Sequence, residues 1–169
     1  PMEPSPALSR QLGEPTWLKL ECLQVTGSFK IRGALFALQE LRDSGASTVA
    51  TCSAGNHGLG LAFAARLAKM PARIYVPGQV DPGKVKLMKG RGADGRVSPH
   101  PGFDEMEAWA KDEVKRDGIP FISAYDDELI LAGNGGTMMR EMRRQLPGLE
   151  TLILPVGGGG LSGGMLLSA

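Results

Sequence analysis

Four consecutive glycines, Gly157 to Gly160, follow directly on the apolar run Thr151–Val156. Glycine loses more conformational freedom on folding than any other residue, so four in a row are costly unless the backbone must approach something closely. A strand that runs into a glycine-rich turn and then a helix points bare backbone N–H groups at an anion, most often a phosphate. The run therefore predicts a strand–turn–helix unit with an anion-binding turn.

Segments with the features of strands and of helices alternate along the chain before this turn. Strands are expected at 16–20, 48–51, 73–76 and 119–122. Helices are expected at 28–42 with Ser28 as its cap, at 56–69, from Pro82 to Gly90 or Gly92, and around the stripes Phe103-Met106-Ala110-Val114 and Met138-Met139-Met142-Leu146. This alternation is typical of an α/β fold with mostly parallel strands.

The composition excludes several classes of protein. The 169 residues carry a formal net charge of +1, whereas a nucleic-acid partner would call for a basic stripe. No apolar run is long enough to span a bilayer, so no membrane partner is expected. The two cysteines, Cys22 and Cys52, lie in or beside apolar segments, which predicts reduced, buried thiols in a cytoplasmic protein.

Lys30 lies where a strand-like segment gives way to a helix. A lysine in the first turn of a helix lies at the positive end of the macrodipole, which disfavours its ammonium form. A lowered pKa leaves more free amine, and a free amine attacks carbonyls. By placement alone Lys30 could equally be a surface charge, but a Schiff-base lysine would be held in this way.

A third motif, Ser53-Ala54-Gly55-Asn56-His57-Gly58, joins an expected strand to an expected helix. A carboxylate ligand needs several donors in a small loop, and Ser53, the Asn56 amide and nearby N–H groups can supply them. Asn56 could instead be a simple turn residue, and His57 a helix-terminal histidine bonded to backbone. Cys52 and His57 could also form a nucleophile with its base, although the Gly55-Asn56 turn between them suits a binding loop better.

In this order the motifs resemble those of the fold-type II pyridoxal-phosphate-dependent enzymes, most closely the threonine/serine dehydratase and serine racemase branch. The runs that carry the resemblance are Leu18–Glu21, Gly27–Ala34, Ser53–His57 and the four glycines. The resemblance covers nearly the whole chain. The family continues for roughly as many residues again after the glycine turn, so we expect this chain to be the N-terminal half of a longer protein.

The resemblance implies a two-lobed α/β fold like that of tryptophan synthase β, with mostly parallel open sheets and the site between the lobes. Residues 42–127 would form a small domain. Residues 1–41 and 128–169 would belong to a large cofactor-binding domain, which is incomplete here. The protein would act on a small amino acid and form a homo-oligomer, either a dimer or a tetramer.

The resemblance also implies a role for each motif residue. Lys30 would form the Schiff base with pyridoxal 5'-phosphate, Phe29 would pack near the pyridine ring, and Asn56 would hydrogen-bond the phenolic oxygen. The substrate carboxylate would lie against Ser53, Gly55, Asn56 and His57. Backbone N–H groups would wrap the phosphate at Gly157, Gly158, Gly159, Gly160 and Leu161. We assign no metal ligand among these residues.

Ala54 distinguishes the branches. In the racemase branch this position is a serine that exchanges a proton on the face opposite the lysine, and alanine cannot do so. The sequence therefore predicts β-elimination from a β-hydroxy amino acid such as threonine or serine, giving a 2-oxo acid and ammonia, with Lys30 as general base. The cysteine-synthase branch usually has threonine at the position of His57.

Three alternatives stay open. The chain could belong to an amino-acid racemase of the same family. It could be a non-catalytic fragment that binds a small ligand, since a fragment of this length is expected to be inactive by itself. Finally, Gly158–Gly163 matches the G-x-G-x-x-G pattern of nicotinamide-binding folds, but Lys30 and the Asn56 loop have no task in that model.

Overall fold

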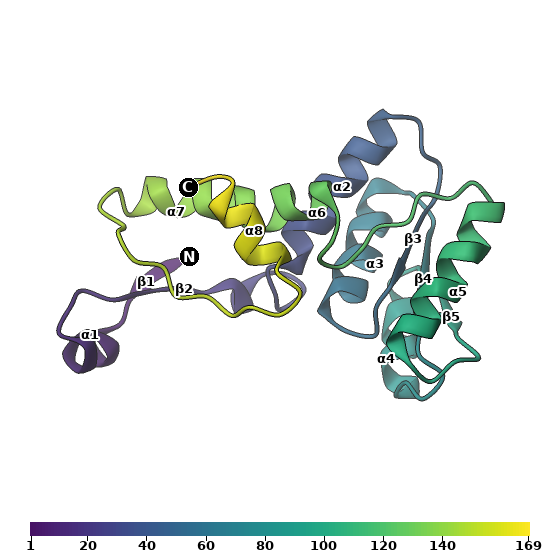
Figure 1. Cartoon of the computed structure of the whole chain (residues 1–169), viewed down its shortest axis with the longest axis horizontal. Helices are drawn as coiled ribbons and strands as arrows, with labels where there is room; N and C mark the ends of the chain where they lie inside the picture. The colour runs from purple at the N-terminus through teal and green to yellow at the C-terminus, as the bar shows by residue number, and fades with distance from the viewer.

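The computed structural model describes residues 1–169 and is elongated, with a parallel sheet at one end (Figure 1). The strands of this sheet, in spatial order, are β3 (Val49–Cys52), β4 (Ala72–Val76) and β5 (Asp94–Val97). Parallel neighbours need a crossover connection, which is made here by α3 (Asn56–Ala68) and α4 (Pro82–Gly90). The expectation of an α/β fold with parallel strands is confirmed.

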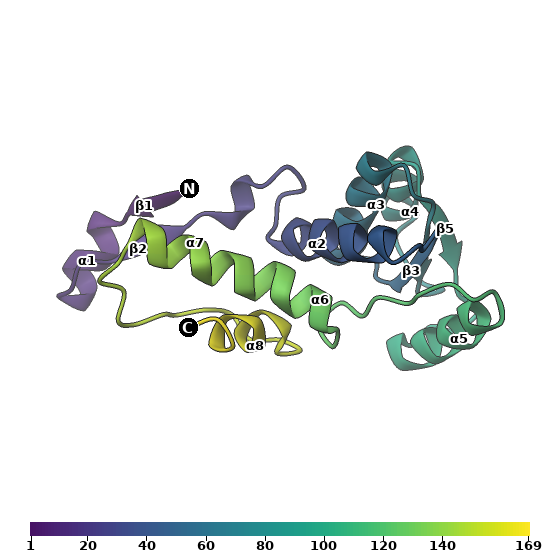
Figure 2. The ribbon, with the colours of Figure 1, turned by 90° about the horizontal axis from the view of Figure 1, so that it is seen from above.

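Side chains of the sheet alternate between two apolar layers, as the two-residue period of a strand requires. Cys52 and Tyr75 face α5 (Phe103–Arg116), whose buried stripe is Met106, Ala110 and Val114. Ile74 and Val76 face the opposite way and pack against α3 and α4. Figure 2 shows α5 apart from α3 and α4, with the strands between them.

Helix α2 (Lys30–Asp43) joins the sheet to the other end of the molecule (Figure 2). Its buried residues, among them Ile31 and Leu38, pack in one cluster with residues of α3. The helix begins one residue later than expected: Phe29 rather than Ser28 is the N-cap, and the Ser28 hydroxyl accepts the Lys30 N–H at 3.4 Å. Ser28 as the cap is therefore wrong, because the turn after Gly27, at φ 76°, places it too early.

The other end of the molecule is mainly helical. Its elements are β1 (Met2–Pro4), α1 (Pro6–Leu12), β2 (Trp17–Lys19), η1 (Glu21–Leu23), α6 (Glu128–Leu131), η2 (Ala132–Gly136), α7 (Thr137–Gln145) and α8 (Gly160–Leu166). Strands β1 and β2 pair antiparallel. Met138, Met142 and Met165 form a buried cluster, so the methionine stripe is core, as its spacing predicts. No helix has both the length and the apolar character needed to cross a bilayer.

Two expected strands are absent. Within 119–122 only Phe121 pairs, in a single parallel bridge to Ala50, because Pro120 has no N–H to extend the ladder. The run 151–156 forms neither strand nor helix, and Ile153 is 83% exposed. Neither sheet of the structure offers a strand for this run to pair with. Cys52 is buried as predicted, whereas Cys22 is exposed because it lies on the surface turn η1.

Candidate functional site around Lys30

Lys30 is the first residue of α2, and its side chain is half-buried. Its Nζ donates a hydrogen bond to the Ala124 carbonyl at 2.7 Å and lies 5.4 Å from the centroid of the Phe29 ring. Burial lowers the pKa of the Lys30 amine. The direction agrees with the sequence prediction, but the cause is removal of the ammonium from water rather than the helix macrodipole.

The glycine turn packs on the residue that follows Ala124. A Cβ on Gly158 would lie 2.5 Å from Cγ of Tyr125, and one on Gly160 would lie 2.8 Å from the Tyr125 carbonyl oxygen. Gly159 adopts φ 85°, a left-handed conformation suited to glycine, immediately before α8. Residues 124 and 125 therefore connect the Lys30 amine to the glycine turn, although Lys30 and Gly158 are far apart in sequence.

The start of α8 offers backbone donors. No side chain caps Gly159, and its carbonyl accepts the first helical bond from the Gly163 N–H at 2.8 Å. The N–H groups of the preceding first-turn residues, Gly160, Leu161 and Ser162, therefore have no partner within the helix. The predicted phosphate-binding residues end at Leu161 and do not include Ser162. Because the first turn of a helix leaves its N–H groups free, Ser162 could have been predicted as well.

The loop from Ser53 to His57 leads from β3 into α3. Gly55 is the N-cap without a capping side chain, and the first helical bond is donated by the Leu59 N–H to the Gly55 carbonyl at 3.1 Å. The Asn56 side chain is exposed. The backbone N–H of Asn56 is the first of the N–H groups in the first turn of α3 that have no partner within the helix. Ser53 Oγ accepts the Gly55 N–H at 3.1 Å, so this hydroxyl shapes the loop.

The His57 imidazole is packed inside the molecule at 2% exposure. The Thr51 hydroxyl donates to the Ile122 carbonyl at 2.7 Å, so it can only accept from His57, and Nε2 of His57 carries the proton at 3.1 Å. Burial, assisted by the charge of Lys30, lowers the pKa of His57 to about 3. The ring is therefore neutral, and its other nitrogen, Nδ1, is a buried acceptor without a hydrogen-bond partner.

Helices α2 and α3 cross where their functional residues lie. A Cβ on Gly60 would lie 3.3 Å from the backbone C and O of Lys30, so the second turn of α3 touches the first turn of α2. The structure thus gathers Lys30, the start of α3 and the glycine turn around one place. Cys52 is not part of it: its thiol lies in the α5 layer, and burial raises its pKa to about 12, which argues against a Cys52–His57 nucleophile.

An ion network that the sequence analysis missed holds the first turn of α2. Arg32 contacts both carboxylate oxygens of Glu21 at 2.8 Å and donates to Glu141 at 2.6 Å. Glu141 also pairs with Lys19 at 2.7 Å. Arg32 and Glu21 both lie in the motif runs. The opposite charges within these runs were the sequence signal from which this ion pair could have been predicted.

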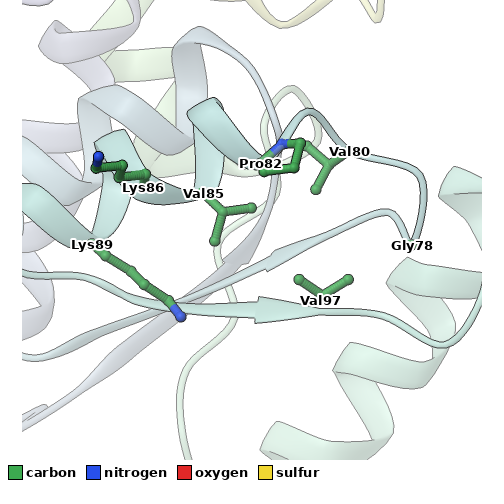
Figure 3. A pocket seen from close by; sticks show the side chains of 7 residues that line it. All are labelled: Gly78, Val80, Pro82, Val85, Lys86, Lys89 and Val97. Carbon is green, nitrogen blue, oxygen red and sulfur yellow. The ribbon is translucent and has the colours of Figure 1, made fainter.

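A separate hollow of about 460 Å³ lies between α4 and the edge of the sheet (Figure 3). Val85 of α4 and Val97 of β5 face each other across it, and Lys86 and Lys89 are its charged groups. None of the predicted site residues lines it, and both lysines are exposed. We assign it no function.

The chain matches one family over nearly all its length. The family model of pyridoxal-phosphate-dependent enzymes matches residues 1–168. An L-threonine ammonia-lyase of Geobacter sulfurreducens is 40% identical over 158 residues, 93% of this chain and 39% of that protein. A serine racemase of Schizosaccharomyces pombe is 34% identical over 171 residues, 100% of this chain and 52% of that protein.

Solved structures that are similar to this one come from the same family. The structure of the processed form of threonine deaminase isoform 2 from Solanum lycopersicum superposes with a TM-score of 0.91 at 34% identity, covering 99% of this chain and 46% of that one. The chain thus spans between 39% and 52% of the length of these relatives. Motifs, fold and family model agree, and the chain belongs to the pyridoxal-phosphate-dependent enzyme family.

Proposed function

We propose that this chain is part of a pyridoxal-phosphate-dependent ammonia-lyase that converts a β-hydroxy amino acid, such as threonine or serine, to a 2-oxo acid and ammonia. The observation that carries the proposal is the half-buried Lys30 amine, held by Ala124 next to the residue on which the glycine turn packs. The threonine ammonia-lyase and threonine deaminase among the relatives support this reaction.

The residues present fit the cofactor. A phosphate dianion needs donors without bulk, and the glycine turn and first turn of α8 supply N–H groups from Gly157, Gly158, Gly159, Gly160 and Leu161. Lys30, with its lowered pKa, would bind the aldehyde, and Phe29 would lie against the ring. Exposed Asn56 would donate to the phenolic oxygen.

When bound, the cofactor withdraws electrons from the substrate Cα and so makes its proton acidic. The free amine of Lys30 would remove this proton, and its partial burial favours the uncharged form that a base needs. The substrate carboxylate would be held at the uncapped start of α3 by the N–H groups of Asn56 and His57, with Gly55 and Ser53 shaping the loop.

Racemisation is the second candidate, and the serine racemase of Schizosaccharomyces pombe favours it. A racemase needs a second proton-transfer group opposite the lysine. Ala54, in the middle of the loop, has none, which supports elimination over racemisation. A non-catalytic ligand-binding role for the chain alone is the remaining alternative, so the decisive experiment uses the full-length protein.

We further propose that residues 42–127 form a small domain and that 1–41 and 128–169 belong to a large one. Separate apolar layers on the two faces of the sheet support a small domain. A cytoplasmic location is supported by the two free thiols. The homo-oligomer, dimer or tetramer, rests on the family resemblance.

The test begins with the full-length protein and pyridoxal phosphate. We expect a visible absorption band and, after borohydride reduction, a cofactor adduct on Lys30 found by peptide mass spectrometry. Lys30→Ala should lose both. Threonine or serine should then release 2-oxo acid, whereas interconversion of serine enantiomers without oxo acid would establish the racemase instead.

A further inference from the structure

A π-helical turn interrupts the long helix formed by α6 and α7. Figure 2 shows α6, η2 and α7 as one continuous helix, and η2 is the π turn with the sequence Ala-Gly-Asn-Gly-Gly. Four of its residues are buried: Gly133, Asn134, Gly135 and Gly136. Single π turns within α-helices are rare and often occur at functional sites, and neither the motifs nor the proposed reaction uses this one.

One side of the π turn touches the helix that carries Lys30. A Cβ on Gly133 would lie 2.6 Å from Cα of Gly33, so the two backbones are in direct contact. Asn134, 1% exposed, accepts the Gly33 N–H through Oδ1 at 2.8 Å. Gly33 lies in the same helical turn as Lys30. A buried amide is costly without a partner, so this hydrogen bond favours one rotation of α2 about its axis.

The other side of the π turn touches the helix that follows the glycine turn. A Cβ on Gly135 would overlap the Leu161 carbonyl oxygen and would lie 2.5 Å from the Met165 N. A Cβ on Gly164 would in turn overlap the Leu131 carbonyl oxygen. Helix α8 is therefore seated backbone to backbone against η2, as α2 is.

We propose that the π turn sets the spacing between the Lys30 amine and the anion-binding glycine turn, and that Asn134 is a positioning residue for Lys30. The proposal rests on the proposed function, because the spacing matters only if one ligand spans both places. Backbone contacts through glycines leave no flexible side chains to absorb a shift, so a displacement of α2 or α8 changes the distance directly.

The test compares three variants of the full-length protein. Asn134→Leu keeps the volume but removes the acceptor, and Asn134→Gln keeps the amide but moves it by one methylene. Gly148→Ala is the control outside the π turn, because its Cβ would stand in open space and meets no atom of α2 or α8. The readouts are the dissociation constant for pyridoxal phosphate and the pH dependence of borohydride trapping on Lys30.

Asn134→Leu should weaken cofactor binding about tenfold, as loss of a supporting hydrogen bond commonly does. It should also move the midpoint of trapping to higher pH, because a loosened α2 returns the amine to water. Asn134→Gln should change both in the same direction by a smaller factor, and Gly148→Ala should change neither.

The proposal is wrong if Asn134→Leu, or Asn134→Gln should the leucine variant not fold, matches Gly148→Ala in both measurements. That result would leave the proposed function intact, provided that the unaltered protein traps the cofactor on Lys30. Failure of the unaltered protein to trap it would instead reject the proposed function.

Discussion

At the scale of single residues, burial decides the chemistry of the site. Lys30 is half-buried with a neutral carbonyl as hydrogen-bond partner, so its amine is easier to deprotonate than that of an exposed lysine. His57 is buried beside it and stays neutral, with its proton fixed on Nε2 by Thr51. Because the ring is neutral, it adds no positive charge next to the Lys30 amine. The two groups lie close enough for the charge of Lys30 to lower the pKa of His57 further.

The role of Ala54 can be tested directly. Ala54→Ser in the full-length protein should raise racemisation of serine from background to a measurable rate, because a hydroxyl then stands where a proton can be exchanged on the second face. Chiral chromatography of serine recovered after incubation measures this rate. An unchanged rate would remove the argument from this position.

Because His57 is buried in its neutral form, the free energy of unfolding should decrease when the pH is lowered. The pKa of His57 is about 3 in the fold and 6.5 ordinarily, so the unfolded chain takes up a proton first as the pH falls. The contribution of His57 to stability is complete above its ordinary pKa and decreases towards its folded pKa. Relative to His57→Gln, the unaltered protein should lose about 3 kcal/mol of unfolding free energy from pH 6.5 to about pH 4. Urea titrations at several pH values measure the difference, and parallel curves would contradict the expectation.

At the scale of elements, the site depends on the contacts made by the first turns of α2, α3 and α8. The first turn of α2 is held from one side by Arg32, with its two carboxylate partners, and from the other by Asn134. The first turns of α3 and α8 carry no side-chain cap, and their N–H groups stay open. One helix start is thus held rigid, and two are left available to anions.

Breaking the Arg32 network should destabilise the fold modestly. Burial opposes ionisation of Glu141, but hydrogen bonds from Lys19 and Arg32 outweigh it and lower its pKa. Its contribution is therefore present above the ordinary carboxyl pKa and lost as the pH falls below it. Glu141→Gln should cost about 1 kcal/mol at neutral pH, since the carboxylate is partly screened by water, and less in acid.

The exposed pair of Arg42 and Asp43 provides the control. These groups lie 3.8 Å apart, with more than half of each side chain exposed. Asp43→Asn should leave the free energy of unfolding unchanged at either pH. Equal losses for Asp43→Asn and Glu141→Gln would show that the network does not hold α2.

Two adjacent glycines offer a matched test of the glycine turn. Gly157 has open space where a Cβ would stand, whereas a Cβ on Gly158 would collide with the Tyr125 ring. Gly158→Ala should force the turn away from residues 124 and 125 at a cost of about 1–3 kcal/mol. Affinity for pyridoxal phosphate should then fall at least about tenfold, which absorbance titration of the full-length variant measures. Gly157→Ala should leave the free energy of unfolding unchanged, and equal losses of stability in the two variants by urea titration would contradict the packing described.

At the scale of the whole molecule, α2 spans between the sheet and the helical end, and the site lies at its start (Figure 1). The three motifs meet there although they are far apart in sequence. The segment at 122–125 matters to this arrangement, because its carbonyls receive Thr51 and Lys30 while Tyr125 supports the glycine turn. No motif marks this segment in the sequence.

Thiol labelling should report on the whole fold. Cys22 is exposed and should react at once with a maleimide in the native full-length protein. Cys52 is buried with a pKa of about 12, so it should react only when the sheet and α5 separate. Peptide mass spectrometry after timed labelling separates the two sites, and simultaneous labelling would be inconsistent with this core.

The helices with clear apolar stripes were predictable because a helix buries one face whatever its partner. The stripe on α5 and the methionines of α7 are examples. The strand at 94–97 was not predicted, because Asp94 and Arg96 give it a polar sequence and only pairing with β4 makes it a strand. The opposite error at 151–156 has the same cause, since an apolar run forms no ladder without a neighbour.

The amino-acid sequence by itself determined the family, the α/β class and the motif residues, because these depend on residue types at short spacings. Only the tertiary structure decided that Ala124 holds the Lys30 amine, that the His57 ring is buried and neutral, and that Asn134 reaches Gly33. Burial and hydrogen bonds between distant segments arise when the chain closes on itself, and no local pattern encodes which groups then meet.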